Sequence, residues 1–423
     1  MRRLLLLVSL LSCAPSQGRD SFVLTVALWG RLGQLHPINQ EGEIVAVASP
    51  WVFEKLASID ATGNLRPVFA TSVERVSGSR LRVSLRREST FSDGTPVTDA
   101  DVVRSLSGHH LQIQSPEHGV LLVEASEPGV SAEMQLTEAN IFREVNGRFL
   151  GSGPFVVASE NDGEVRLVRR RTERARVNEV RLIAYPTPRQ AFQHTLKGDA
   201  NMIVELEPRT IEILDGVPSL RVLREPGHTA DAVMFNTRLS RAERVAIAGA
   251  LNSEQVRELA YESGACTESR EAHPEQPPMI PSGPALDVLS WGPFDRLAMS
   301  ARRGLAERGG EVVSLPVQEV LNRVHSGQFD MIPARPLMWP PSVMVRIWHT
   351  GSPDNLTGYS NKTVDAALDA GDWAAARAAM LQDPPAALIC TRERIAVVDA
   401  RIKNAMLGPW ELLETLPEWE VSQ

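Results

Sequence analysis

The chain has 423 residues, 43% of them hydrophobic, which is enough for two or three domains with cores of their own. Its formal net charge of −8 argues against a general nucleic-acid-binding protein, because such proteins are usually basic. Beyond the first residues, no stretch approaches the roughly 20 apolar residues that span a bilayer.

The first thirteen residues have the pattern of an export signal, with basic residues before an apolar run. The run ends in Leu10-Leu-Ser-Cys13, which resembles a bacterial lipobox. An ordinary secretory signal cut after a small residue such as Ala14 is the alternative. We predict a lipoprotein-type signal peptide over residues 1–13, lipidation at Cys13 and a flexible tether over residues 14–21.

The elements after the tether indicate an α/β protein. Residues 22–29 predict a strand, residues 45–59 a helix, and the alternation over residues 81–85 a half-buried strand. Residues 91–106 predict the end of a strand, a turn at Asp93-Gly94 and a helix that begins with a capping-box-like pattern at Thr98. Strands and helices then alternate after residue 151 and again after residue 241.

Motifs for bond chemistry are missing from the sequence. It contains no HExxH, no P-loop, no Gly-x-Ser-x-Gly and no Cys/His set with zinc spacing. His109 and His110 are adjacent, so on a helix or strand they would point apart, and we predict a surface pair. We therefore predict a binding protein that is not an enzyme and uses no cofactor and no metal.

Residues 91–106, FSDGTPVTDADVVRSL, resemble the signature of the family 5 extracellular solute-binding proteins, the peptide and nickel receptors of ABC importers. Four other segments resemble segments of this family in the same order, so the resemblance runs from about residue 22 to the C-terminus. These segments are residues 64–74, 151–155, 235–237 and 354–365.

The resemblance implies a periplasmic-binding-protein-like α/β fold, with two α/β lobes around a ligand cleft and an additional β-rich subdomain. On this basis we place lobe I at residues 22–50, 151–238 and 400–423. The β-rich subdomain takes residues 51–150 and is shorter than in the family, and lobe II takes residues 239–399.

The resemblance also suggests ligand contacts. Glu41 and Glu43 follow the first strand in a loop that runs along the ligand in the family, although a solvated acidic loop is the alternative. Asn355 and Tyr359 match the family motif in residues 354–365.

One departure from the family concerns the ligand class. Its peptide receptors usually carry an aspartate after the strand at residues 329–332, and that carboxylate pairs with the α-amino group of the peptide. Here no acidic residue occurs from residue 331 to residue 353. Arg335 would instead favour an anion if it faced the cleft. Trp339 would either stack on a ligand or pack in the core.

Cys266 and Cys390 remain after Cys13 is set aside. An even pair in an exported protein favours a disulfide, with two buried thiols as the alternative.

These observations predict the substrate-binding receptor of an ABC importer. It would capture an oligopeptide-like solute in the cleft and deliver it to a permease and its ATPase subunits. We expect a monomeric, membrane-anchored lipoprotein of the periplasm or cell surface that does not bind nucleic acid. The alternative is a lipid-anchored scaffold or sensor that kept the fold and lost transport.

Overall fold

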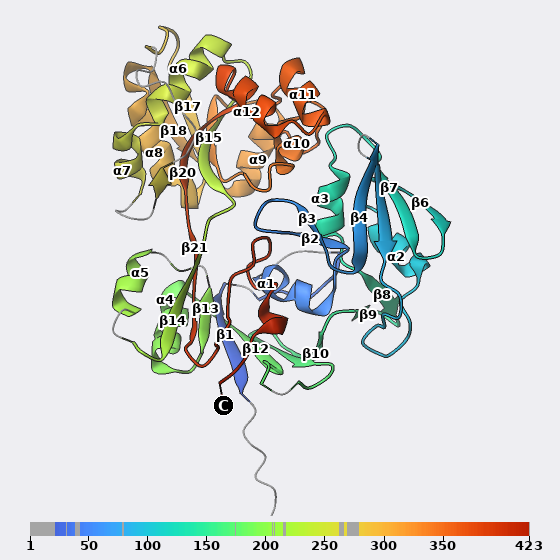
Figure 1. Ribbon diagram of the computed structural model, residues 1–423. Coiled ribbons are helices and arrows are strands. Elements are labelled where there is room, and N and C mark those ends of the chain that lie inside the picture. Colours follow the sequence, from blue (N-terminus) through green and yellow to red (C-terminus); the bar gives the residue numbers. More distant parts are fainter. Residues whose placement is uncertain are drawn as a thin grey trace, which may run out of the picture.

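A computed structural model describes residues 22–30, 32–38, 43–77, 80–173, 175–204, 206, 208–214, 217–261, 266–268 and 279–422. Two lobes lie one above the other, and a smaller domain lies beside them (Figure 1). Within the described ranges, the three units are built on a seven-stranded, a six-stranded and a four-stranded sheet.

Lobe I contains the seven-stranded sheet, in the order β10-β11-β12-β1-β13-β21-β14. Strand β1 pairs in parallel with β12 and with β13, and the other pairings are antiparallel. Apolar side chains such as Leu24, Val26 and Leu182 form its core together with Trp51 of α1. Its elements are β1 (Val23–Trp29), α1 (Glu43–Val52), β10 (Phe155–Glu160), β11 (Glu164–Arg169), β12 (Glu179–Tyr185), α4 (Pro188–Lys197), β13 (Met202–Val204), α5 (Pro208–Leu214), β14 (Leu220–Glu225) and β21 (Arg394–Asp399).

Lobe II contains the six-stranded sheet, in the order β16-β20-β15-β19-β17-β18. Its central strand β15 is buried at every position, as expected for a strand covered on both faces. The strands are β15 (Ala230–Phe235), β16 (Thr267–Glu268), β17 (Leu286–Ser290), β18 (Gly309–Ser314), β19 (Met331–Ala334) and β20 (Ala386–Thr391). The helices are α6 (Arg241–Leu251), α7 (Glu254–Ala260), α8 (Asp295–Gly304), α9 (Val317–His325), α10 (Val343–Trp348), α11 (Lys362–Asp369) and α12 (Trp373–Gln382).

The small domain is rich in strands. Its main sheet has the order β4-β5-β7-β6, and two hairpins, β2-β3 and β8-β9, lie outside this sheet. Its elements are β2 (Ala57–Ile59), β3 (Leu65–Pro67), β4 (Ala70–Ser77), β5 (Arg80–Leu85), α2 (Asp99–Leu106), β6 (Leu111–Glu117), β7 (Val120–Ala125), α3 (Ala132–Glu138), β8 (Phe142–Val145) and β9 (Arg148–Gly151).

Two of the boundaries drawn from sequence are wrong. Strand β15 is paired with β19 and β20, so the chain enters lobe II near residue 229 and residues 235–237 end a strand of lobe II instead of closing lobe I. Strand β21 is paired with β13 and β14, so the chain is back in lobe I by residue 394 and not at residue 400. The sequence shows a strand at each place, but only the sheet pairing shows to which lobe it belongs.

The predicted helix over residues 45–59 is too long. Helix α1 ends at Val52, and residues 57–59 form β2, which pairs with β3.

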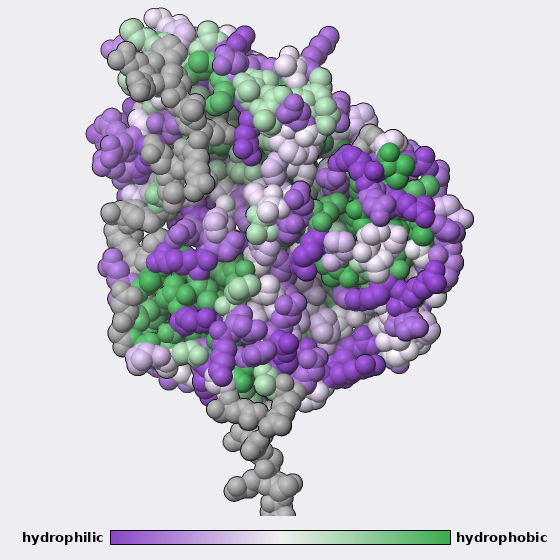
Figure 2. Space-filling view, in the orientation of Figure 1, coloured by the Kyte–Doolittle hydropathy of each residue, from purple (hydrophilic) through white to green (hydrophobic). Residues whose placement is uncertain are grey.

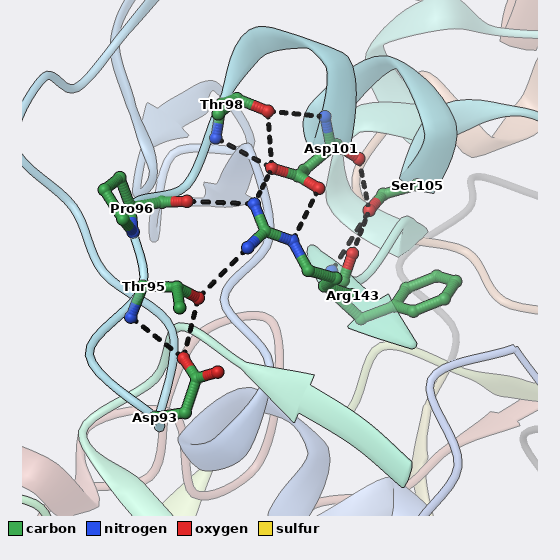
Figure 3. A network of polar contacts seen from close by, with 8 residues as sticks. Asp93, Thr95, Pro96, Thr98, Asp101, Ser105 and Arg143 are labelled. Atoms are coloured by element: carbon green, nitrogen blue, oxygen red, sulfur yellow. Dashed lines mark hydrogen bonds and ion pairs between the residues drawn. The ribbon is translucent and has the colours of Figure 1, made fainter. Parts of the chain in front are cut away.

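Residues 91–106, the stretch that resembles the family signature, form a turn and helix α2 in the small domain (Figure 3). Thr98 caps α2 in a full capping box with Asp101. From β8, Arg143 donates hydrogen bonds to Asp101, to the Thr95 hydroxyl (3.0 Å) and to the Pro96 carbonyl (2.9 Å). Burial alone would raise the pKa of Asp101, but hydrogen bonds from Arg143 and Thr98 outweigh it and lower that pKa below 3.8. The signature therefore fixes a corner of the small domain, and its Phe91 carbonyl accepts a hydrogen bond of 2.5 Å from Arg170 of lobe I.

Candidate functional site

The chain crosses between the lobes twice. The first crossing, residues 226–229, joins β14 to β15, and the second, residues 392–393, joins β20 to β21. A Cβ atom on Gly227 would collide with the carbonyl oxygen of Arg392, so only glycine fits where the two crossings touch. We call this pair of adjacent crossings the hinge.

Strand register shows which edge of each lobe lies at the hinge. Strand β21 starts directly after the second crossing, and its Ala396 pairs with Val204 of β13, so the C-terminal end of β13 is at the hinge. Strand β15 starts directly after the first crossing, and its Ala232 pairs with Ala334 of β19. The C-terminal ends of β13 and β19 therefore lie on the lobe edges that meet at the hinge.

Arg335 lies on the hinge-side edge of lobe II, directly after β19. Its guanidinium pairs with the carboxylate of Asp231, which is almost fully buried, and lies 5.6 Å from the centre of the Phe294 ring. Its own side chain stays 41% exposed. The positive charge is therefore matched within the protein, while part of the side chain still faces outward from this edge.

Trp339 links the two lobes. Its ring stacks on His228 of the first crossing, with centroids 4.2 Å apart, and lies 6.2 Å from the ring of Trp410 in lobe I. Trp339 and Trp410 are both partly exposed. The result is an aromatic cluster of His228, Trp339 and Trp410 beside the hinge.

The segment that carries Trp410, residues 404–416, is fixed on several sides. Arg394 of β21 donates to the carbonyl oxygens of Gly408 (2.7 Å) and Trp410 (3.3 Å). Glu411 pairs with Lys55, and Glu414 pairs with Arg66, both on the small-domain side. The indole Nε1 of Trp51 donates to the Leu413 carbonyl at 2.7 Å. These contacts hold Trp410 toward lobe II.

The aromatic cluster predicts a pH dependence. Burial, and then the charge of Arg394, lowers the pKa of His228 to about 3, so its ring is neutral at pH 7. Because an unfolded chain binds this proton near pH 6.5, the free energy of unfolding should fall as the pH drops from 6.5 toward 3. We expect this group to lower it by about 1–2 kcal/mol at pH 5, after discounting for partial exposure.

The measurement is urea denaturation at pH 7.5 and pH 5. His228→Phe keeps a ring in the cluster and should remove this part of the loss, whereas His325→Phe, at an exposed position on α9, should keep it. Equal pH dependence in wild type and His228→Phe would contradict the assignment.

A pocket of about 650 Å³ lies on lobe I and extends along α4 from the hinge-side ends of the strands. It lies at the ends of β1 and β13, beside α4 and α5, and its polar lining is Arg189, Gln193 and Thr210. Figure 2 shows the hydrophobic surface beside α4 and α5 on the lower lobe. The apolar lining residues are Trp29, Phe192, Leu196, Ile203, Leu206 and Ile213.

Asn355 and Tyr359 are engaged in contacts within lobe II, and their contact with a ligand stays a prediction. The amide nitrogen of Asn355 donates to the carbonyl oxygens of His349 (3.2 Å) and Tyr359 (2.7 Å). Tyr359 is 1% exposed, and its hydroxyl donates to the Asp383 carbonyl at 2.9 Å. Both side chains are used to hold a loop of lobe II together.

Of the remaining predicted residues, some lie outside the described ranges and two form the predicted cysteine pair. Cys13, the tether at 14–21 and Glu41 lie outside the described residues, as does the side chain of Glu43 at the start of α1. Cys266 and Cys390 are paired in the structure on the edge of lobe II, with Cα atoms 5.4 Å apart. That spacing suits a disulfide.

Within the described ranges, no helix is long and apolar enough to cross a membrane. The same ranges hold no group of three His, Cys, Asp or Glu side chains that could bind a metal ion.

His228, Trp410 and the lobe I pocket were not found from sequence. Trp410 stands in a segment without a motif, and His228 is a single histidine after a Pro-Gly turn. The only sequence signal for the pocket was the strand-helix-strand order at residues 180–206, since ligands in open α/β sheets bind beyond the C-terminal ends of strands.

Comparison with known proteins identifies the fold. No protein-family model and no curated protein matches the chain in sequence. Solved structures match over nearly its whole length. The oligopeptide-binding protein AppA from Bacillus subtilis, in complex with a nonapeptide, has a TM-score of 0.71 at 13% identity, covering 95% of this chain and 99% of that one.

Two further structures agree. The PBP AgaA from A. tumefaciens R10, in complex with agropinic acid, has a TM-score of 0.76 at 18% identity, covering 95% of this chain and 99% of that one. NikA from Staphylococcus aureus, in complex with Ni(L-His)2, has a TM-score of 0.69 at 13% identity, covering 95% and 100%.

The chain therefore has a periplasmic-binding-protein-like α/β fold, as the resemblance implied. Peptide-binding and nickel-binding proteins are among the solved structures that share this fold.

Proposed function

We propose that this protein is the substrate-binding receptor of an ABC importer. The observation that carries the proposal is the pair of lobes joined by two crossings, with a pocket and a partly exposed arginine on the edges that meet at the hinge. A ligand held by both edges would favour the closed arrangement of the lobes, because only that arrangement lets both contact it. A permease and its ATPases would then receive the solute.

An oligopeptide-like solute is the proposed ligand class. Proteins of this fold include one bound to a nonapeptide and one bound to agropinic acid, so both peptides and other carboxylates are reasonable candidates. The usual aspartate is missing between residues 331 and 353, and Asp231 is already paired with Arg335. A free α-amino group is therefore not required for binding.

The test is thermal unfolding of the leader-free protein with di- to hexapeptides, their N-acetylated forms, amino acids, sugars and divalent metals. A ligand at a hundredfold excess over its dissociation constant should stabilise the protein by roughly 2.7 kcal/mol. We expect free and acetylated peptides to raise the midpoint equally. If nothing raises it, the receptor proposal fails.

A scaffold or sensor is the second candidate. The aromatic cluster favours it, because the rings of Trp339 and Trp410, 6.2 Å apart, link the two lobes through the protein's own side chains. Permease and ATPase genes beside this gene would favour the importer.

We also propose a membrane anchor at Cys13, on the basis of the lipobox-like sequence. Cys13→Ser should move the protein from the membrane fraction to the soluble fraction of the cells. Unchanged partitioning on fractionation would contradict the anchor.

A further inference from the structure

The pocket on lobe I is an apolar feature that reaches the hinge-side ends of β1 and β13. Six large apolar side chains line it, from β1, α4, β13 and α5 and from Leu206, two residues beyond the end of β13. Two of these side chains are strongly exposed, Ile213 at 60% and Leu196 at 38%. Exposed apolar groups that gather in a hollow mark a place where another apolar group binds.

We infer that this pocket receives a bulky apolar side chain of the bound peptide, aromatic or branched aliphatic. This inference rests on the proposed function and adds a ligand preference to it. A volume of about 650 Å³ lies within the range of ordinary ligand pockets, roughly 300–1,000 Å³, and exceeds what an alanine side chain fills.

Position supports a ligand over a membrane partner as the occupant. The pocket lies at the C-terminal ends of β1 and β13, and Leu206, on its wall, donates its backbone N–H to Ile395 of β21 just after the hinge crossing. A peptide held at the hinge would thus have this pocket beside it. The surface forms a hollow, which can enclose a side chain. A face that docks on a permease needs to match the permease surface but does not need to be hollow.

The polar lining suits the backbone of such a peptide. Arg189, at the start of α4, forms no ion pair with any described residue, and Gln193 lies one turn further along the same helix. Both can donate hydrogen bonds to peptide carbonyl or carboxylate oxygens. None of the lining residues is acidic.

The experiment is isothermal titration calorimetry of the leader-free protein with Ala-Phe-Ala, Ala-Leu-Ala, Ala-Lys-Ala and Ala-Ala-Ala. We expect Ala-Phe-Ala and Ala-Leu-Ala to bind at least about tenfold more tightly than Ala-Ala-Ala, because their side chains leave water. Ala-Lys-Ala should show no such gain.

Three variants test the location. Ile213→Ser and Leu196→Ser change exposed side chains and should fold normally, yet each should reduce the preference for phenylalanine several-fold. Thr210→Phe fills the pocket from its wall and should abolish the preference. Met299→Ser, at a 62% exposed position on α8 of lobe II, is the matched control and should leave the preference unchanged.

The outcomes separate this inference from the function on which it rests. Equal binding of all four peptides would overturn the inference and leave the receptor standing. A preference that survives in all three pocket variants would also overturn it, and would leave the apolar hollow as a candidate protein-docking face. Binding of none of the four peptides would overturn this inference, and the receptor proposal would then depend on the wider thermal-unfolding screen.

Discussion

Replacing Arg143 with leucine is expected to lower the free energy of unfolding by about 3 kcal/mol. The substitution keeps an apolar stem but removes the cation from Asp101, whose side chain is only 7% exposed. It also removes the hydrogen bonds to Thr95 and Pro96 that hold the turn before α2 (Figure 3). An unpaired buried carboxylate is costly, so the effect should exceed that of losing an ordinary surface ion pair.

Urea denaturation at pH 7 measures this change. Arg148→Leu is the matched control, because Arg148 is an exposed arginine in the same β8-β9 hairpin, and it should change the free energy by less than about 0.5 kcal/mol. Adding Asp101→Asn to Arg143→Leu should recover part of the loss, since no charge then stays buried. A loss below about 1 kcal/mol for Arg143→Leu would mean that the network is not important for stability.

Loss of the Cys266–Cys390 bridge should have an effect of similar or larger size. The two cysteines are 124 residues apart, and closing a loop of this length restricts the unfolded chain by about 4–5 kcal/mol in the chain-entropy account. The bridge also holds the short strand β16 against β20 at the edge of lobe II. The double variant Cys266→Ala, Cys390→Ala should therefore unfold at a much lower temperature.

Two measurements check the bridge. Intact mass after alkylation of the unreduced, leader-free protein should show no modified thiol, and two modified thiols would rule the bridge out. Reductant should lower the unfolding midpoint of the wild type but not that of the double variant, which separates the bridge from the packing of the buried Cys390 side chain.

The α/β class could be predicted from local patterns in the sequence, whereas the two-lobe architecture was implied by the family resemblance. The capping box at Thr98 and the strand-helix-strand order at residues 180–206 formed as expected. The glycines of the segment at residues 151–155 also have a clear role. A Cβ atom on Gly151 or Gly153 would collide with the backbone at the end of α1, so the segment packs directly against that helix.

The site could be predicted much less well. Asn355 and Tyr359 matched a family motif, but their side chains hold the loop of lobe II in place. Arg335 and Trp339 do lie at the hinge, but their partners Asp231, His228 and Trp410 come from distant parts of the chain. Such contacts depend on which sheet each of the strands β15, β19 and β21 joins, and no local pattern in the sequence shows this.

The central claim is that a peptide binds between the lobes, and hydrogen exchange with saturating Ala-Phe-Ala tests it most directly. We predict slower exchange both at the C-terminal end of β13 with α5 in lobe I and at the end of β19 up to Trp339 in lobe II. Helix α12, far from the hinge in lobe II, should be unchanged (Figure 1). Protection of only one lobe edge, or protection elsewhere with neither edge affected, would contradict the claim.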